Sequence, residues 1–325
     1  MKKLFLVCLL LVSAVLLSGC NFMNNNNGGD DEKNLQTFEG ENAEKVVAEQ
    51  LNNVAKTTVK NVNQISVKFD GRIEASMMNE EGQLEDQNMT VHLDAALVLD
   101  DQRVPQAASA VATLLDHNNE GLEFEAYLKE GKFYGYAKAS GLGLFASDAE
   151  ADYGYEDDLT IPPLEVEDAD IDEIFEGLDE YLKLLPAPVV TFNEKNAEFT
   201  VVYECNDANL EAWVNSIAAL SGANDGQITV EQVRTMLTIN QVKLTLVLTS
   251  GKLTGFKLDV DVVAKDEFVA MAGFGKVKTN IDLKIAYENV SPKFDSARLA
   301  EIKAGYEAQQ SEHEDHSYED NSSEE

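Results

Sequence analysis

The stretch MTVHLDAALVL, residues 89–99, places an apolar side chain at every second position without interruption. Residues 65–75 repeat this alternation, with Ile65, Val67 and Phe69 on one parity. Strict alternation is typical of a strand that buries one face and exposes the other. We therefore predict two long, half-buried antiparallel strands, and a sheet built from such strands decides the fold class.

Further alternating segments extend the predicted sheet on both sides of these two strands. All but the last, residues 281–287, contain a turn signal such as Glu130-Gly131 or Ser250-Gly251, which favours a hairpin over a single strand. The predicted hairpins and strands cover residues 122–139, 189–203, 242–263 and 281–287.

Helical spacing of apolar residues appears between the strand segments. Asn42 can cap a helix that runs to about residue 61, and Thr229 with Gln232 has the pattern of a capping box. The remaining predicted helices cover residues 104–115, 171–185, 207–220 and 296–306. The sequence thus predicts an α+β fold in which a long antiparallel sheet packs on several helices.

Composition divides the chain into an ordered body and flanking segments. The body covers residues 41–306. Residues 147–170 are acidic and contain Pro162-Pro163, so we expect an exposed loop or a boundary where two halves meet. Residues 20–40 are rich in Asn, Gly and acids and cannot bury enough apolar surface to fold, so we expect a flexible tether. Residues 307–325 are expected to form an acidic, disordered tail.

The N-terminal segment has the physical features of an export signal. Lys2-Lys3 precede an apolar run over residues 4–17, which is shorter than the ~20 residues that a spanning helix needs. The run ends in Leu17-Ser18-Gly19-Cys20, which resembles the lipobox of bacterial lipoprotein signals. The resemblance implies that residues 1–19 are cleaved and that Cys20 receives a diacylglycerol thioether and an N-acyl chain such as palmitate. The expected location is the extracytoplasmic face of the cell membrane, with the body held ~25 Å from the lipid on average by its tether.

Charge restricts the possible partners of this chain. The formal net charge is −34, with 59 acidic and 25 basic residues, and such a surface repels nucleic acid and anionic headgroups. Contact with the membrane is therefore expected through the lipid anchor alone, and nucleic acid is excluded as a partner. The same charge leaves open a cationic protein partner for the acidic loops.

The order of elements carries a second resemblance. A lipidated cysteine, a polar tether, a helix and long alternating strands with hairpins such as LKEGKFY (residues 128–134) resemble LolA-like and LppX-like bacterial lipoproteins. The resemblance implies a strongly curved, half-barrel-like antiparallel sheet wrapped around helices. In that family the space between sheet and helices can hold acyl chains, which would make this protein a lipid carrier or a related sensor.

A cavity of that kind would be lined by the side chains at alternate strand positions that face inward. The same side chains serve equally well as a closed core, because periodicity does not distinguish a hollow core from a filled one. The predicted lining residues are Val67, Phe69, Leu93, Leu97, Phe124, Leu244, Leu246 and Leu258.

Motifs for catalysis, cofactors or metals are weak in this sequence. Residues 221–232 resemble the second half of an EF-hand loop, but Asp225 is the sole carboxylate at a ligand position and Gln232 replaces the bidentate Glu. The acidic residues 148–158 carry Tyr153 where a calcium loop needs Gly. No pair of carboxylates, and no histidine near a nucleophile, suggests acid–base or nucleophilic chemistry. We therefore predict a non-enzymatic protein without a metal or cofactor.

Two functions follow from the sequence. The first is a lipid-anchored extracytoplasmic lipoprotein that binds a hydrophobic or lipid-like ligand between sheet and helices. The second is a structural or interaction lipoprotein with a solid core, whose acidic loops contact a cationic partner.

Overall fold

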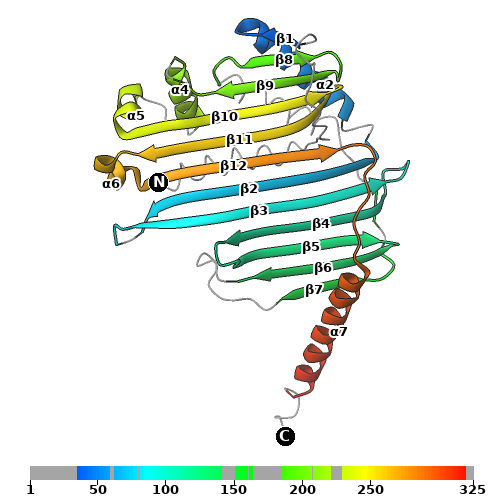
Figure 1. The fold of residues 1–325 in the computed structure, drawn as a ribbon. Helices are drawn as coiled ribbons and strands as arrows, with labels where there is room; N and C mark the ends of the chain where they lie inside the picture. Colours follow the sequence, from blue (N-terminus) through cyan, green and yellow to red (C-terminus); the bar gives the residue numbers. More distant parts are fainter. Residues whose placement is uncertain are drawn as a thin grey trace. The chain divides into compact units, whose positions relative to one another are not determined.

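The computed structural model describes residues 35–58, 62–79, 81–140, 151–159, 161–163, 185–206, 208–220 and 229–319. These residues form twelve strands and a few helices, and every strand pairing with a defined register is antiparallel (Figure 1). The predicted sheet-dominated α+β fold is confirmed at this level. The signal segment, the tether up to residue 34 and the predicted helix 171–185 lie outside the described residues.

The chain divides into two compact units, each made from three segments. Unit 1 contains Met1–Val62, Phe69–Met89 and Val166–Ala286, and unit 2 contains Asn63–Lys68, Thr90–Glu165 and Tyr287–Glu325. The two long strands predicted first from the sequence are present as β2 (Gln64–Met78) and β3 (Leu84–Leu99), and each contributes residues to both units.

Unit 1 contains a continuous run of antiparallel strands in the order β1, β8, β9, β10, β11, β12. Their bounds are β1 Leu35–Phe38, β8 Val189–Asn193, β9 Glu198–Glu204, β10 Leu237–Thr249, β11 Lys252–Ala264 and β12 Phe274–Ala286. The predicted hairpins over residues 189–203 and 242–263 are therefore confirmed.

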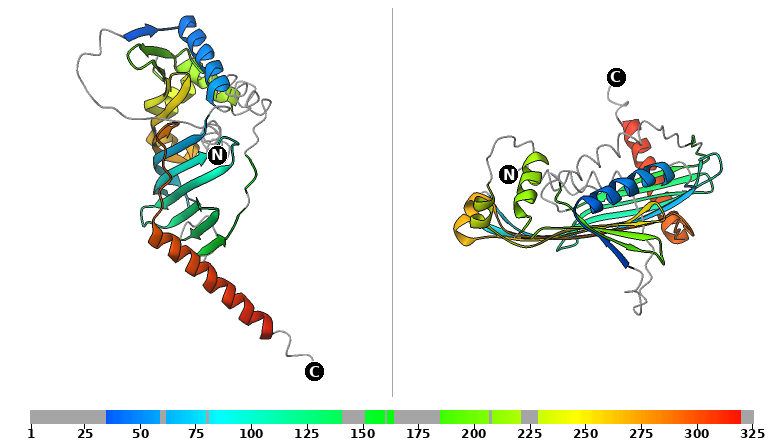
Figure 2. Two further views of the ribbon diagram at one scale, coloured as in Figure 1. Left: turned by 90° about the vertical axis from the view of Figure 1, so that its right-hand side faces the viewer. Right: turned by 90° about the horizontal axis from the view of Figure 1, so that it is seen from above.

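One face of these strands is covered by α2 (Glu41–Thr58), the helix predicted to run to about residue 61. Asn42, its predicted N-cap, lies inside the helix, which begins one residue earlier. α2 contacts β8 and β11, and Figure 2 shows it lying along one side of the strands. Its apolar stripe is buried at Ala43, Val47, Leu51 and Val54. The helix forms because these residues recur every three or four positions and gain stability by packing on the sheet.

Short helices connect the strands of unit 1. α4 (Leu210–Leu220) and α5 (Val230–Met236) pack together through Leu210, Val214 and Val233. The predicted capping box is present: Thr229 Oγ1 accepts from the Gln232 amide, and Gln232 Oε1 accepts from the Thr229 amide. A 3₁₀ turn, Asp266–Phe268, and α6 (Val269–Ala272) connect β11 to β12.

Unit 2 contains four consecutive antiparallel strands and the C-terminal helix. The strands are β4 Pro105–Asp116, β5 Gly121–Lys129, β6 Lys132–Ala139 and β7 Asp152–Glu156, and the helix is α7 Ser296–Glu319. The hairpin predicted at Glu130-Gly131 is confirmed, with both residues at positive φ as a two-residue hairpin turn requires. α7 packs on β6 and β7.

The predicted helix over residues 104–115 is wrong, because this segment is strand β4. Its spacing of Val104, Val111 and Leu115 fits a helix, but residues 107–115 pair with β5 at every position. Turns fix both ends: Asp100 Oδ1 accepts from the Gln102 and Val104 amides, and Asp116 Oδ1 accepts from the Asn118 and Glu120 amides. Pairing with a neighbouring strand outweighs the modest helical preference of the alanines.

Three expectations for loop or disorder are also wrong in part. Residues 35–38, in the stretch 20–40 expected to be a flexible tether, form β1 and pair with β8. Residues 152–156, in the stretch expected to be an exposed loop, form β7, whose Tyr153 and Tyr155 alternate with smaller or charged residues as in a strand. The helix expected over residues 296–306 continues as α7 to Glu319, so residues 307–319 are not a disordered tail. The helix-forming residues Glu307 and Gln309 extend it, and Lys303 pairs with Glu307 at 3.6 Å.

Candidate functional site

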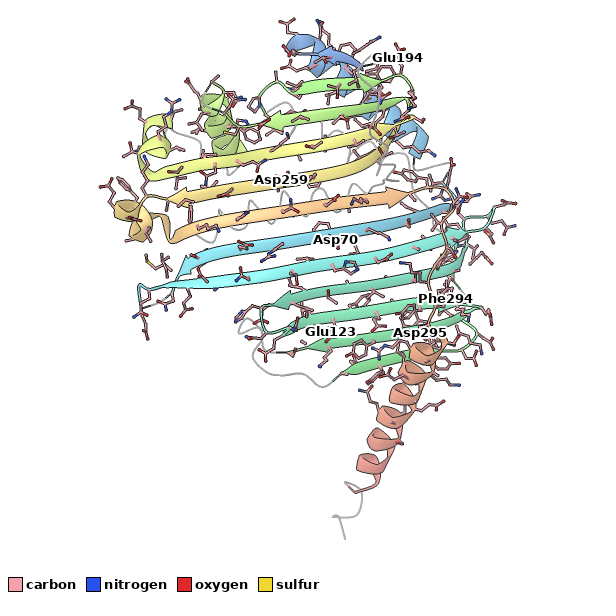
Figure 3. The ribbon with its side chains drawn as sticks, viewed as in Figure 1. Asp70, Glu123, Glu194, Asp259, Phe294 and Asp295 are labelled. Carbon is pink, nitrogen blue, oxygen red and sulfur yellow. The ribbon has the colours of Figure 1, made fainter. Side chains whose placement is uncertain are left out.

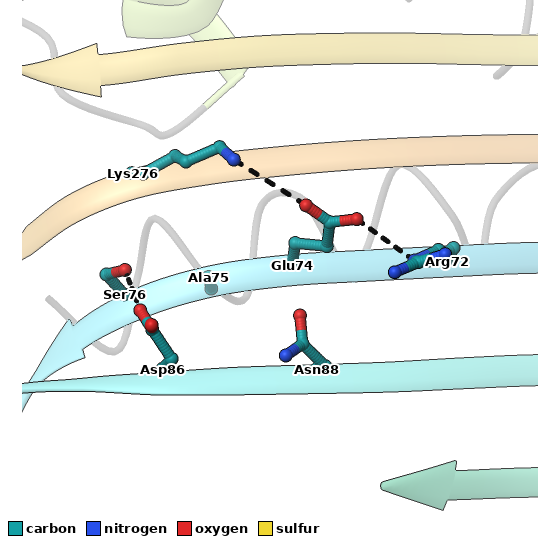
Figure 4. Close-up of a pocket in the computed structure, with 7 residues that line it drawn as sticks. All are labelled: Arg72, Glu74, Ala75, Ser76, Asp86, Asn88 and Lys276. Atoms are coloured by element: carbon teal, nitrogen blue, oxygen red, sulfur yellow. Dashed lines mark hydrogen bonds and ion pairs between the residues drawn. The ribbon is translucent and has the colours of Figure 1, made fainter. Parts of the chain in front are cut away.

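A polar hollow of about 380 Å³ lies in unit 1 on β2, β3 and β12 (Figure 4). Glu74 stands at its centre, with Oε1 3.0 Å from Arg72 Nε and Oε2 3.6 Å from Lys276 Nζ. Ser76 donates a hydrogen bond to the carboxylate of Asp86. Arg72 and Lys276 therefore both pair with Glu74, and Asp86 accepts a hydrogen bond from Ser76. The hollow can accommodate a small polar solute, and Ser76 with Asp86 is the one hydroxyl–carboxylate pair among its seven lining residues.

A second candidate surface lies in unit 2, and hydrogen bonds identify its two faces. The Lys293 amide donates to Ser109 Oγ at 3.1 Å, and Lys293 Nζ lies 2.6 Å from Asp94 Oδ2. Lys68 Nζ lies 3.8 Å from the same oxygen, so these side chains share one face. Alternation places their strand neighbours on the opposite face. The four predicted lining residues of unit 2 belong to that opposite face: Val67, Leu93, Leu97 and Phe124.

We call this opposite face the apolar face. It contains no charged side chain between Val91 and Leu99 of β3, and none among the paired residues of β4, β5 and β6. The β5 register places Phe124 between Ala112 on β4 and Ala137 on β6. The other members from these three strands are Ala108, Ala110, Leu114, Leu122, Ala126, Leu128, Phe133, Gly135 and Ala139. Alanine neighbours leave the Phe124 ring standing above the sheet, and 49% of Phe124 is exposed.

The four predicted lining residues of unit 1 are placed differently. Leu244 pairs with Leu258, and Leu246 pairs with Phe256. Leu246 and Phe69 are buried, whereas Leu244 and Leu258 are partly buried. These residues are therefore buried or partly buried within unit 1, where α2 packs on β8 and β11. The predicted set is thus divided between a packed core in unit 1 and a partly exposed surface in unit 2.

The face of unit 2 opposite to the apolar face carries a tyrosine cluster that the sequence analysis missed. Tyr134 and Tyr136 on β6 pair with Tyr155 and Tyr153 on β7, and their ring centroids are 5.3 and 5.5 Å apart. α7 packs on this cluster through Leu299 and Ile302. The sequence feature that indicates this cluster is the repeated Tyr-Gly-Tyr of residues 134–136 and 153–155.

An ion pair attaches α7 to the same face. Arg298 binds the carboxylate of Glu125, which also accepts a hydrogen bond from Tyr127 Oη at 2.7 Å. Burial acts to raise the pKa of Glu125, but the hydrogen bonds from Arg298 and Tyr127 outweigh it and the pKa is lowered. Burial, reinforced by Glu125, raises the pKa of Tyr127. Nearby, Phe294 packs on Tyr127 immediately before Asp295 and α7 (Figure 3). These groups are structural, since each is occupied by a partner within unit 2.

Metal binding receives no support from the part of the chain that the structure describes, where no three His, Cys, Asp or Glu side chains come together. Thr229 and Gln232, at the end of the EF-hand-like stretch, act as a helix cap, and residues 221–228 lie outside the described residues. In the acidic stretch, Asp157 forms an ion pair with Lys132 at 2.7 Å. Within the same described ranges, no helix has the length and apolarity to cross a membrane. Cys20 lies outside them.

Comparisons with known proteins add no family. No protein-family model matches the chain, and no curated protein matches it. Among solved structures, an N-terminal dehydratase from the difficidin assembly line aligns with 8% identity over 84% of this chain and 98% of that chain, with a TM-score of 0.10. A TM-score of this size carries no argument about fold or activity.

Proposed function

We propose that this protein is a lipid-anchored lipoprotein on the extracytoplasmic face of the cell membrane that binds an apolar, lipid-like ligand without catalysing a reaction. Cys20 is the proposed anchor, and residues 21–34 the tether that ends at β1. The finer architecture in this proposal is a sheet that curves around helices, as the resemblance to LolA-like and LppX-like lipoproteins implies.

The apolar face of unit 2 is the observation that carries the proposal. A chain with a net charge of −34 gains nothing in solubility from an exposed Phe124 surrounded by alanines and leucines. Exposed apolar surfaces of some extent on an acidic protein commonly mark binding sites. A surface of aliphatic and aromatic groups without charge recognises hydrocarbon, because burial of apolar area is then the whole driving force.

Unit 1 favours the second function instead. Val190, Val201 and Leu248 of this unit are fully buried, which supports a filled core over a carrier cavity. In that function, the protein is an interaction lipoprotein and the acidic loops contact a cationic partner. The two functions differ in one measurable property, which is whether the body binds hydrocarbon.

Binding of a fluorescent long-chain fatty acid to the purified protein tests the proposal. We expect Phe124→Ser to weaken binding about tenfold, since losing ~1.4 kcal/mol of apolar contact has that effect. Leu35→Ser is the matched control, because Leu35 is 48% exposed but belongs to β1 of unit 1. Native mass spectrometry of the wild type would show co-purified lipid. Absence of binding, or equal loss in both variants, would favour the interaction function.

The anchor requires a separate experiment. In a bacterial host, intact-mass analysis of the membrane fraction should show a chain beginning at Cys20 and carrying a diacylglyceryl group with or without an N-acyl chain. Cys20→Ala should remove both the modification and the cleavage. A wild-type chain that keeps residues 1–19 and has the mass of its unmodified sequence would refute lipidation, whatever the fatty-acid experiment shows.

A further inference from the structure

α7 contacts β5, β6 and β7 one after another, and its last side-chain contact is with the outer edge of β7. Arg298 lies over the Tyr136 ring of β6, with its guanidinium carbon 4.3 Å from the centroid. Lys303 Nζ lies 4.8 Å from the centroid of Tyr155 on β7. Six residues further along α7, the Gln309 side chain reaches the backbone of β7. The helix therefore passes from the sheet surface to its outer edge (Figure 1).

The Gln309 side chain binds this edge as a neighbouring strand would. Its Oε1 accepts a hydrogen bond from the Tyr153 amide at 3.2 Å, and its Nε2 donates to the Ala151 carbonyl at 2.7 Å. A primary amide has the same donor and acceptor as a peptide group. Gln309 thus occupies, with one side chain, two main-chain positions that a further strand would use.

The rest of the β7 edge follows from strand alternation. In an antiparallel ladder, the N–H and C=O of one residue point to the same side, and successive residues point to opposite sides. Because the Tyr153 amide points outward to Gln309, the main-chain groups of Tyr155 also point outward, whereas those of Gly154 point to β6. Among the strands that the structure describes, β7 is therefore an edge strand, and the main-chain groups of Tyr153 and Tyr155 are available for pairing when α7 is displaced.

The sequence of β7 is nearly self-complementary. Residues 152–156 read DYGYE, and antiparallel pairing of two such strands about Gly154 sets Tyr153 opposite Tyr155. The molecule already contains this kind of pair, because Tyr134-Gly135-Tyr136 of β6 pairs with Tyr153-Gly154-Tyr155 in the same antiparallel register. A second copy of β7 therefore fits the outer edge of β7 as β6 fits the inner edge.

We propose that α7 is an edge cap that prevents two copies of this chain from joining through antiparallel β7–β7 pairing. Such a pair has a two-fold axis through Gly154 and closes after two copies. Acidic residues are a second barrier, because Asp152 of one copy would lie opposite Glu156 of the other. Like charges across a strand pair are destabilising and are screened by salt. An uncapped protein should therefore dimerise more readily at high ionic strength.

The test uses the full-length chain in detergent, with Gln309→Leu as the uncapping variant and Gln310→Leu as its matched control. Gln310 is exposed and adjacent, so its replacement changes helix composition equally without touching β7. Hydrogen exchange should show the Tyr153 amide exchanging about tenfold faster in Gln309→Leu only, since that amide loses its partner. Cross-linking followed by mass analysis should show dimer in Gln309→Leu, increasing with salt.

A double variant identifies the edge responsible. Tyr155→Pro removes the outward N–H of Tyr155 and leaves the Gly154 pairing with β6, because proline is tolerated on an outer edge. We expect Gln309→Leu combined with Tyr155→Pro to return to monomer. The proposal is overturned if Gln309→Leu stays monomeric while its Tyr153 amide is deprotected, or if the dimer persists in the double variant. Equal exchange in all variants would show that Gln309 does not cap the edge.

Discussion

The guanidinium of Arg298 on α7 holds both carboxylate oxygens of Glu125 on β5. Nη2 lies 2.7 Å from Oε1, and Nε lies 3.0 Å from Oε1 and 3.2 Å from Oε2. The two residues are 173 positions apart in the chain, so this pair ties the C-terminal helix to the strands of unit 2. Hydrogen bonds to charged groups in a partly buried setting are among the stronger polar interactions of a protein.

Glu125→Gln should therefore loosen α7, and the effect should depend on pH. The pKa of Glu125 is lowered in the folded protein, because hydrogen bonds from Arg298 and Tyr127 outweigh burial. Its contribution to stability is then complete above the ordinary glutamate pKa of 4.5 and is lost as pH falls through the lower folded value. We expect a loss of about 1–3 kcal/mol in urea unfolding at neutral pH and a much smaller difference in strong acid.

Glu301→Gln is the control for that measurement. Glu301 also contacts Arg298, at 2.9 Å, but its side chain is 62% exposed. Exposed ion pairs contribute ~1 kcal/mol or less, so this variant should unfold close to wild type. Equal losses in the two variants would show that general charge balance, and not the Glu125 pair, holds the helix.

Gly305→Ala should destabilise α7, although alanine is the better helix former by ~1 kcal/mol. A Cβ at position 305 would lie 2.7 to 2.8 Å from the Cδ1, Cε1 and Cγ atoms of Tyr153. The Tyr153 ring cannot easily retreat because it packs on Tyr136. We expect faster hydrogen exchange in α7 beyond residue 305. Ala304→Gly, one position earlier and exposed, should show the ordinary glycine penalty without undocking the helix.

Thr229→Ala should weaken α5 by about 1 kcal/mol, because the capping box loses its hydroxyl acceptor for the Gln232 amide. The seven-residue helix is short, so its stability depends heavily on that cap. Thr229→Ser, which keeps the hydroxyl, should restore most of the protection of α5 amides in hydrogen exchange. Unchanged exchange in Thr229→Ala would mean that Val233 packing alone holds α5.

The strands in which apolar and polar residues alternate strictly were the ones best predicted from the sequence. Residues 65–75 and 89–99 became β2 and β3, because one buried face requires an apolar residue at every second position. β4 was misread because alanine fits helix and strand, and spacing alone did not separate them. The turns at Asp100 and Asp116, where carboxylates bind nearby amides, were the local evidence that a strand lay between them.

The candidate surface was predicted in part for a similar reason. The alternation of apolar residues predicted one face for Leu93, Leu97 and Phe124, but it could not predict that α2 packs on β8 and β11 of unit 1. The role of Gln309 could not be foreseen, since a single glutamine in an acidic stretch carries no pattern. Its meaning depends on the direction of α7 across β7, which is a tertiary property.

Glu198→Gln should stabilise the protein at neutral pH. Glu198, at the start of β9, pairs with Asn193 and Thr249, and burial raises its pKa. For a carboxyl with a raised folded pKa, the protonated form is favoured, so stability is greatest in acid and falls as pH rises through that pKa. The neutral amide removes this penalty. We expect the thermal midpoint to rise by about 1–2 °C at pH 7 and to match wild type near pH 4. Glu204→Gln, at the exposed end of the same strand, should show no such gain, and an equal rise there would indicate relief of overall negative charge.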